Sequence, residues 1–195
     1  MADAAGAMRR TLTALTARLA ADSIPGAVIL KECAITGQLS LRGNLESAAL
    51  AQAAIGCGLP SEPNRVAISG DLAALWLGPD EWLLTMPIER LPALAATLAA
   101  AFAGRRAAIT DVSAARTILL LEGPKAREVL MKGCSLDLHP DHFKPGHCAQ
   151  TNLARTHIIL RQLDPAPSYH LYVRPSYAEY LASWLVDAMA EYRIR

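Results

Sequence analysis

Four side chains that can bind a metal lie close together in the sequence. They are His139, His142, His147 and Cys148, and zinc accepts imidazole nitrogen and thiolate sulfur at short spacings. Two prolines and a glycine divide this stretch into turns, and the four residues form no regular pattern of ligand pairs. We therefore interpret the histidines as polar loop residues and expect no metal-binding residue in this chain.

The same stretch offers a thiol beside a base. Cys148 follows His147 directly, but adjacent residues on a strand point to opposite faces, so the imidazole is poorly placed to activate the thiol. Asp80 and Glu81 are adjacent rather than spaced for paired acid and base catalysis. We expect these two acids to cap or solvate a turn.

The rest of the sequence adds no motif for catalysis or cofactor binding. It has no G-x-G-x-x-G that opens a helix after a strand, no P-loop and no G-x-S-x-G. Asp111 is expected to bond a backbone amide of the next turn, near Ser113. The chain is therefore expected to hold no catalytic residue and no cofactor-binding residue.

Composition limits the partners of this 195-residue chain. The 19 basic and 18 acidic side chains give a net charge of +1, so no large field attracts nucleic acid or an anionic membrane. No apolar run approaches the ~20 residues that cross a bilayer. The four cysteines are widely spaced, which favours reduced thiols. These features predict a cytoplasmic protein that binds neither nucleic acid nor membrane.

Two of the three tryptophans stand within ten residues, in the stretch LWLGPDEWLL from Leu75 to Leu84. Its centre, Gly-Pro-Asp, is typical of a turn, and apolar runs of strand character flank it. This predicts a β-hairpin that carries Trp76 on one arm and Trp82 on the other.

The other elements follow from apolar periodicity and from turn residues. Asn44 predicts the start of a helix, and Gly56 or Gly58 predicts its end, while Ser176 and Glu179 predict a capping box for the last helix. The remaining predictions are a weak N-terminal helix over 1–22, a pair of strands at 28–35 and 38–42 joined by a turn at 36–37, strands at 65–69, 73–77, 107–111, 117–122, 148–160 and 169–173, and helices that end at Gly104 and Gly133.

An internal repeat organises these elements. The pattern Leu39-x-Leu41-x-Gly43 aligns with Leu119-x-Leu121-x-Gly123, and each pattern precedes a helix. We therefore predict an α+β fold of two related strand-helix-strand-strand-helix lobes with mostly antiparallel sheets. The expected division is an N-terminal arm or weak helix at 1–24, a first lobe at 25–104 and a second lobe at 105–195, packed as one compact unit.

Several stretches of the sequence resemble a known family. LGPDEWLL and residues 111–117, 134–155 and 176–192 are similar to the gamma subunit of heterotetrameric sarcosine oxidase, and the resemblance runs from about Leu41 to Tyr192. The stretches Asp111-Val112-Ser113 and Gly123-Pro124 are also distantly similar to the N-terminal part of the folate-binding aminomethyltransferases.

The resemblance implies a subunit that acts within a complex with alpha, beta and delta subunits. Such a complex oxidises sarcosine to glycine, produces hydrogen peroxide and passes the one-carbon unit to tetrahydrofolate, which yields 5,10-methylenetetrahydrofolate. In that family the flavins, the dinucleotide and the folate belong to the larger partner subunits. The resemblance therefore implies a non-catalytic subunit with a structural or assembly role.

Two alternatives remain open. One is a free-standing folate-binding or aminomethyltransferase-like module, although that family carries a further C-terminal barrel for which 195 residues leave no room. The other is a scaffold for a different flavin-dependent amine oxidase, since the sequence does not distinguish sarcosine from another N-methyl amino acid.

A subunit of such a complex needs an apolar contact surface, and aromatic residues are common at the centre of such surfaces. We expect the subunit interface to be anchored by Trp76 and Trp82 of the hairpin, and by Phe143 in the proline-rich loop from Pro140 to His147.

Overall fold

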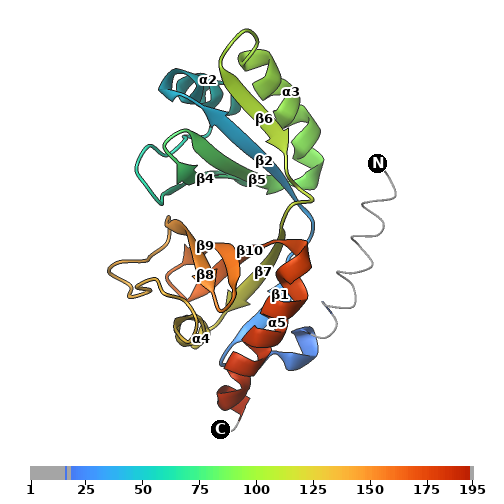
Figure 1. The fold of residues 1–195 in the computed structure, drawn as a ribbon, viewed down its shortest axis with the longest axis vertical. Coiled ribbons are helices and arrows are strands. Elements are labelled where there is room, and N and C mark those ends of the chain that lie inside the picture. The colour runs from blue at the N-terminus through green and yellow to red at the C-terminus, as the bar shows by residue number, and fades with distance from the viewer. Residues whose placement is uncertain (1–15, 17–18, 194–195) are drawn as a thin grey trace. The chain divides into compact units, whose positions relative to one another are not determined.

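The computed structural model describes residue 16 and residues 19–193 (Figure 1). Most of the expected arm at 1–24 lies outside the described residues. Residues 19–22 are helical, and Leu19 is buried. No helix in the described ranges is long and apolar enough to cross a membrane.

The chain forms two compact units. Unit 1 comprises 1–34, 117–145 and 150–195, and unit 2 comprises 35–116 and 146–149. Each unit contains one five-stranded sheet and two of the helices named below, which confirms the predicted α+β class.

The sheet of unit 2 has the strand order β3-β4-β5-β2-β6, and every neighbouring pair is antiparallel. Its strands are β2 (Thr36–Gly43), β3 (Val66–Ser69), β4 (Leu72–Gly78), β5 (Glu81–Pro87) and β6 (Ala107–Asp111). Its helices are α2 (Leu45–Ile55) and α3 (Leu91–Ala101), which contact each other.

Helix α2 begins after Asn44, as predicted, and ends at Gly56, the first of the two glycines expected there. The Asn44 side chain accepts a hydrogen bond from the Ser47 amide at 2.9 Å, which satisfies one of the free amides of the first turn. Gly56 follows the helix with φ 66°, a left-handed conformation that suits glycine. Local chemistry thus defines both ends of this helix.

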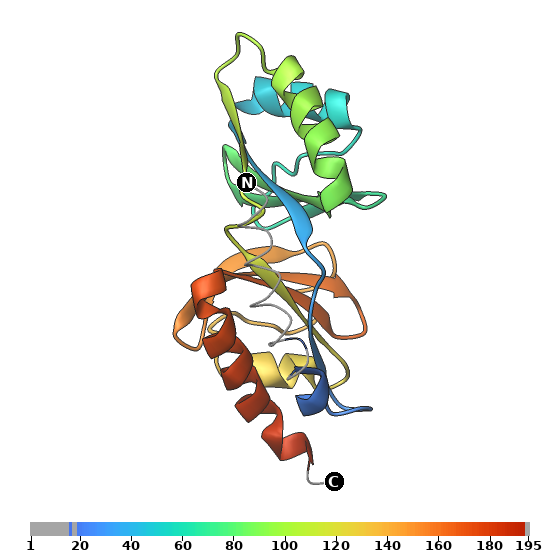
Figure 2. The same ribbon diagram turned by 90° about the vertical axis from the view of Figure 1, so that its right-hand side faces the viewer.

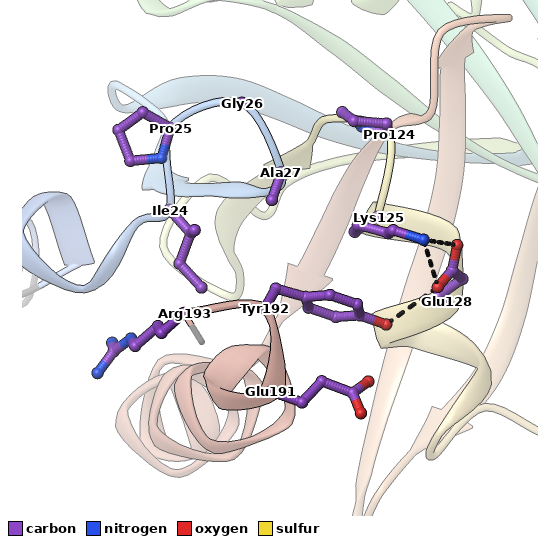
Figure 3. Close-up of a pocket in the computed structure, with 10 residues that line it drawn as sticks. All are labelled: Ile24, Pro25, Gly26, Ala27, Pro124, Lys125, Glu128, Glu191, Tyr192 and Arg193. Carbon is purple, nitrogen blue, oxygen red and sulfur yellow. Dashed lines mark hydrogen bonds and ion pairs between the residues drawn. The ribbon is translucent and has the colours of Figure 1, made fainter. Parts of the chain in front are cut away.

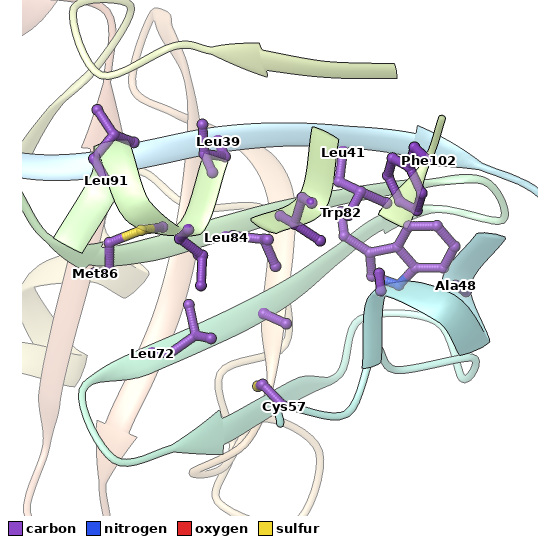
Figure 4. Packing of buried hydrophobic residues seen from close by; sticks show 14 residues of the cluster. Leu39, Leu41, Ala48, Cys57, Leu72, Trp82, Leu84, Met86, Leu91 and Phe102 are labelled. Carbon is purple, nitrogen blue, oxygen red and sulfur yellow. The ribbon is translucent and has the colours of Figure 1, made fainter. Parts of the chain in front are cut away.

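The core of unit 2 lies between one sheet face and these helices (Figure 4). Leu39, Leu41 and Leu84 come from alternate positions of β2 and β5, and Leu94 and Leu98 come from one face of α3. Alternation in strands and a spacing of four residues in the helix bring these side chains onto one shared surface. All five are buried.

Unit 1 repeats this plan with the strand order β1-β7-β10-β9-β8. Its strands are β1 (Ile29–Glu32), β7 (Thr117–Glu122), β8 (Cys148–Leu153), β9 (Thr156–Asp164) and β10 (Ser168–Val173), although the first two residues of β8 are assigned to unit 2. Its helices are α4 (Ala126–Met131) and α5 (Pro175–Met189), which contact each other beside this sheet (Figure 2). Leu30, Leu121 and Tyr169 form one fully buried row across three of the strands.

The two sheets correspond strand by strand, as the repeat predicts. Strands β2, β5, β4 and β3 of unit 2 match β7, β10, β9 and β8 of unit 1, and β6 and β1 occupy equivalent edges. These edge strands are exchanged in sequence, because β1 precedes the first repeat but pairs with β7, whereas β6 precedes the second repeat but pairs with β2. The units therefore differ from the sequential lobes expected at 25–104 and 105–195.

Three local predictions need correction. The strands expected at 28–35 and 38–42 form no hairpin, because β1 and β2 join different sheets. The strand expected at 148–160 is two strands, separated by a turn in which Ala154 has φ 52°. The expected capping box is also missing, because α5 starts at Pro175 and no side chain caps it.

Gly123 allows the edge strand β1 to dock. Its φ is 120°, and a Cβ atom at this position would lie 2.6 Å from the Ala27 carbonyl oxygen. That oxygen accepts a hydrogen bond from the Lys125 amide at 3.0 Å. The turn from β7 into α4 therefore contacts the segment that leads into β1 so closely that no side chain fits.

We predict that Gly123→Ala lowers the free energy of unfolding by more than about 2 kcal/mol, because it adds a backbone clash to the cost of the positive φ. Gly26→Ala is the matched control, since Gly26 has φ 82° and open space around it, and should cost about 1 kcal/mol. Urea unfolding measures both. Equal losses would show that the contact with Ala27 relaxes at no cost.

Candidate functional site

The tryptophan hairpin exists, but Trp82 belongs to the core. Trp76 on β4 pairs directly with Trp82 on β5, so both side chains lie on the same sheet face. Trp82 is 1% exposed, and its indole N–H donates to the Pro60 carbonyl at 2.8 Å. At the tip, Glu81 forms a 2.6 Å ion pair with Arg42.

The expected interface anchors require correction. Phe143 is 6% exposed, so neither it nor Trp82 can fill a pocket on a partner. Trp76 is half-buried and packs against the core of unit 2, and it remains a candidate for the rim of an interface. The sequence could not separate these residues, because large aromatic side chains suit both cores and interfaces.

The histidine loop does not gather its side chains into one site. His139 and His142 are exposed and approach different acids, Asp141 at 3.4 Å and Asp137 at 3.7 Å. His147 belongs to unit 2 and is hydrogen-bonded to the Arg65 guanidinium. In the described ranges no group of His, Cys, Asp or Glu residues could hold a metal ion.

Cys148 is a buried thiol with structural partners. Its Sγ lies 3.5 Å from the Trp76 carbonyl oxygen and 3.6 Å from that of Arg65. The thiol donates weak hydrogen bonds to these oxygens. These two contacts hold the Cys148 side chain against the backbone of β4 and of the segment before β3.

Asp111 serves the backbone as predicted. Its Oδ1 accepts hydrogen bonds from the Ser113 amide at 2.9 Å and from the Ser113 hydroxyl at 2.6 Å. The Ser113 oxygen in turn accepts from the Gln38 amide at 2.9 Å. This network ties the turn after β6 to β2, so the Asp111 carboxylate is engaged in holding an edge strand.

A titratable group that the sequence did not reveal lies on the sheet of unit 1. His170 on β10 lies opposite Arg161 on β9, and its Nε2 is 3.7 Å from the Cys33 thiol. Burial, assisted by the Arg161 charge, lowers the pKa of His170 to about 4. Burial and the nearby charges of Glu32 and Glu122 raise the pKa of Cys33 to about 11. Both groups are therefore neutral near pH 7.

The C-terminal turn of unit 1 lines a pocket of about 580 Å³ (Figure 3). Lys125 and Lys132 lie 5.6 and 5.0 Å from the centre of the Tyr192 ring. The Tyr192 hydroxyl donates to Glu128 at 3.2 Å, and this acid also accepts from Lys125 at 2.7 Å. Burial and the neighbouring acids raise the pKa of Tyr192.

The charges of this pocket already neutralise one another. Lys125 pairs with Glu128 at 2.7 Å, and Lys132 pairs with Glu191 at 2.6 Å. Cation–π contacts and ion pairs of this kind favour a fixed position for the last turn. The arrangement thus fastens the turn after α5, residues 190–193, to α4 and Lys132.

Comparison with known proteins identifies the family. Residues 42–191 match the model of the sarcosine oxidase gamma subunit family. The chain belongs to this family. The gamma subunit of sarcosine oxidase from Corynebacterium sp. (strain U-96) is 41% identical over 199 aligned residues, which cover 98% of this chain and 95% of that protein.

Solved structures agree with the membership in the gamma subunit family. A chain of the heterotetrameric sarcosine oxidase from Corynebacterium sp. U-96, in complex with pyrrole 2-carboxylate, matches with a TM-score of 0.89 at 37% identity, covering 95% of this chain and 96% of that one. Aminomethyltransferase T of the glycine cleavage system from Bartonella henselae matches with a TM-score of 0.63 at 14% identity, covering 88% and 48%. The second match shows the fold alone and confirms the expected distant similarity.

We predict that the two tryptophans of this gamma-family chain differ in their contribution to stability. Trp82→Ala should lower the free energy of unfolding by about 3–5 kcal/mol, because it leaves a cavity and removes the bond to Pro60. Trp76→Ala should cost clearly less, because the Trp76 side chain is only half-buried. Urea unfolding followed by circular dichroism measures both. A larger loss for Trp76 would contradict the placement of Trp82 in the core.

A second prediction concerns pH. Between pH 6.5 and about 4 the unfolded chain protonates His170 while the folded chain does not, so stability falls as pH falls through this window, by at most about 1.4 kcal/mol per pH unit. Above pH 9 the unfolded chain ionises Cys33 before the folded chain does, so stability falls again as pH rises towards 11.

Urea unfolding at a series of pH values tests both the acid and the alkaline loss of stability. His170→Gln should flatten the acid slope relative to the wild type and leave the alkaline slope, whereas Cys33→Ala should do the reverse. Identical acid slopes for His170→Gln and the wild type would mean that His170 does not cause the acid sensitivity.

Proposed function

We propose that this chain is the gamma subunit of a heterotetrameric sarcosine oxidase and assembles with alpha, beta and delta subunits. The observation that carries the proposal is 41% identity over 98% of this chain and 95% of a sarcosine oxidase gamma subunit. The TM-score of 0.89 to a chain of the heterotetrameric enzyme supports it. Because the match spans nearly the whole of both chains, the shared role concerns the entire subunit.

Within this complex the chain has a structural or assembly role. The complex oxidises sarcosine to glycine, releases hydrogen peroxide and forms 5,10-methylenetetrahydrofolate, and the flavins, the dinucleotide and the folate are held by partner subunits. Polar side chains of this chain already make structural contacts, which supports a division of roles between this subunit and its partners. Asp111 bonds the turn at Ser113, the Cys148 thiol faces backbone carbonyls, and Glu128 and Glu191 are paired with lysines.

This proposal also places the complex in the cytoplasm. All four cysteines are free, and Cys57 and Cys148 are buried. Free thiols are favoured where the redox conditions are reducing.

The alternative of a free-standing folate-binding module rests on fold similarity alone. The match to aminomethyltransferase T covers 48% of that chain at 14% identity. Function resides in sites rather than in folds, so a shared fold gives this chain no folate site. The other alternative, a different flavin-dependent amine oxidase, differs only in the substrate of the assembled complex.

We predict that the chain, produced together with the alpha, beta and delta subunits, co-purifies with them in equal amounts. The purified complex should show a flavin absorption spectrum and release peroxide from sarcosine. The chain purified alone should be colourless, contain no stoichiometric zinc and release no peroxide, because its polar side chains are engaged in structural contacts.

Three results would contradict this proposal. Failure to co-purify would remove the assembly role. Stoichiometric folate or flavin on the chain alone would favour the free-standing module. Peroxide from another N-methyl amino acid, but not from sarcosine, would indicate a different amine oxidase.

A further inference from the structure

Strand β6 forms one edge of the sheet of unit 2. It is the last strand in the order β3-β4-β5-β2-β6, and β2 is its neighbour on the inner side (Figure 1). The outer side of an edge strand carries backbone N–H and C=O groups that can pair with a further strand. What this edge can bind therefore depends on which of its backbone groups point outwards and on what covers them.

The register between β2 and β6 shows which residues of β6 face outwards. The Val112 amide donates to the Gln38 carbonyl at 2.9 Å, in line with that register. Because hydrogen-bonded pairs alternate along an antiparallel ladder, every second residue of β6 turns its backbone groups towards β2. The residues between them, whose backbone groups point outwards, are Ala107, Ile109 and Asp111. Within the described part of the chain these outward groups have no hydrogen-bond partner.

The equivalent edge of unit 1 is covered by the chain itself. On the outer side of β1, the Ser23 hydroxyl accepts from the Leu30 amide at 3.0 Å and lies 3.1 Å from the Leu30 carbonyl oxygen. Ile24 and Val28 exchange backbone hydrogen bonds at 2.8 and 3.0 Å. The same place in the repeated fold thus has backbone partners in unit 1, but has none within the described residues of unit 2.

Strand β6 also lacks the features that commonly prevent an open edge from pairing. Such features are prolines, bulges and charged side chains within the strand. Residues 107–110 contain no proline and no charged residue, and the register with β2 runs without a shift. Ala107 and Ile109 pack against the core of unit 2, which holds the strand in place. The edge is therefore both open and ordered.

The outward residues of β6 are symmetric about Ile109. If two copies of β6 lie antiparallel with Ile109 opposite itself, Ala107 lies opposite Asp111 of the other copy, so every outward group meets one that can bond it. On the other face, Ala108 lies opposite Thr110. No like charges are paired, and the arginines that precede β6 lie near the acidic end of the other strand. The strand is thus complementary to itself.

We propose that two copies of this chain pair through β6 about a two-fold axis and join their unit 2 sheets into one continuous sheet. The occupant of the open edge is therefore a second copy, and such an isologous contact closes at two copies. A strand of five residues buries little surface, so we expect weak pairing, with a dissociation constant between roughly 1 μM and 1 mM. The inference goes beyond the proposed function and does not depend on it.

The test uses the full chain and two double variants at exposed positions of β6. Ala108→Glu with Thr110→Glu places like charges opposite each other in the proposed pair, whereas Ala108→Glu with Thr110→Lys places opposite charges there. Sedimentation equilibrium should show that the first variant dimerises at least about tenfold more weakly than the second. The melting temperatures of the two variants in dilute solution should be similar, because both positions are exposed.

Amide hydrogen exchange gives a second readout that needs no variant. As the concentration of the wild-type chain rises, the amides of Ala107, Ile109 and Asp111 should become protected. The amides of Ala108 and Thr110 face β2, so they should be protected at every concentration. This alternation distinguishes edge pairing from a contact through side chains.

Three results would overturn the inference. The wild-type chain could remain monomeric up to about 1 mM, or the two double variants could dimerise equally well. If the outward amides gain protection only when the alpha, beta and delta subunits are added, the occupant is a strand of a partner subunit. In that case the inference is wrong and the proposed function stands.

Discussion

The pairing of β1 with β7 is the interaction on which the arrangement of this chain depends. Residues Ile29–Glu32 lie next to residues 119–122, about ninety positions along the sequence, and complete the sheet of unit 1. Strand β6 completes the sheet of unit 2 in the equivalent place. Each repeat therefore receives its edge strand from the segment that precedes the other repeat. Such distant pairing has an entropic cost before it stabilises the fold, and the close contact of Gly123 with Ala27 shows how tightly β1 must dock.

Local chemistry explains what the sequence could predict. Asn44 and Gly56 define the ends of α2 through their own bonds and dihedral angles. The Gly-Pro-Asp turn and the apolar runs beside it suffice for the Trp76 to Trp82 hairpin, and β6 and β7 begin and end at the predicted residues. The edge exchange was not predictable in this way, because strands that follow one another are normally expected to pair. The turn between β8 and β9 was missed because Ala154 adopts a positive φ that its residue type does not predict.

The partners of the candidate side chains are set by tertiary contacts. Residue type and spacing alone therefore predicted some of these partners wrongly. His147 lies next to Cys148 in sequence, yet the imidazole bonds Arg65 and the thiol bonds backbone carbonyls. Asp111 was predictable because its partner is two residues away. His170 and Cys33 meet only through the pairing of β1, β7 and β10, so the buried titratable pair follows from the exchanged edge strand.

Tertiary contacts also decide which aromatic residues stabilise the fold and which remain exposed. Trp82 occupies a strand position that faces α2 and α3, and its N–H finds a carbonyl within the core. Tyr177, Tyr180 and Trp184 lie in a second row on a helix whose buried row is already complete with Ala178, Leu181 and Leu185. A helix on a sheet needs only one apolar stripe, and in the described part of the chain Tyr177 and Tyr180 of the second row are 47% and 40% exposed. Residue type is the same in both places, so it is the position on the strand or the helix that decides which aromatic side chain leaves a cavity when it is removed.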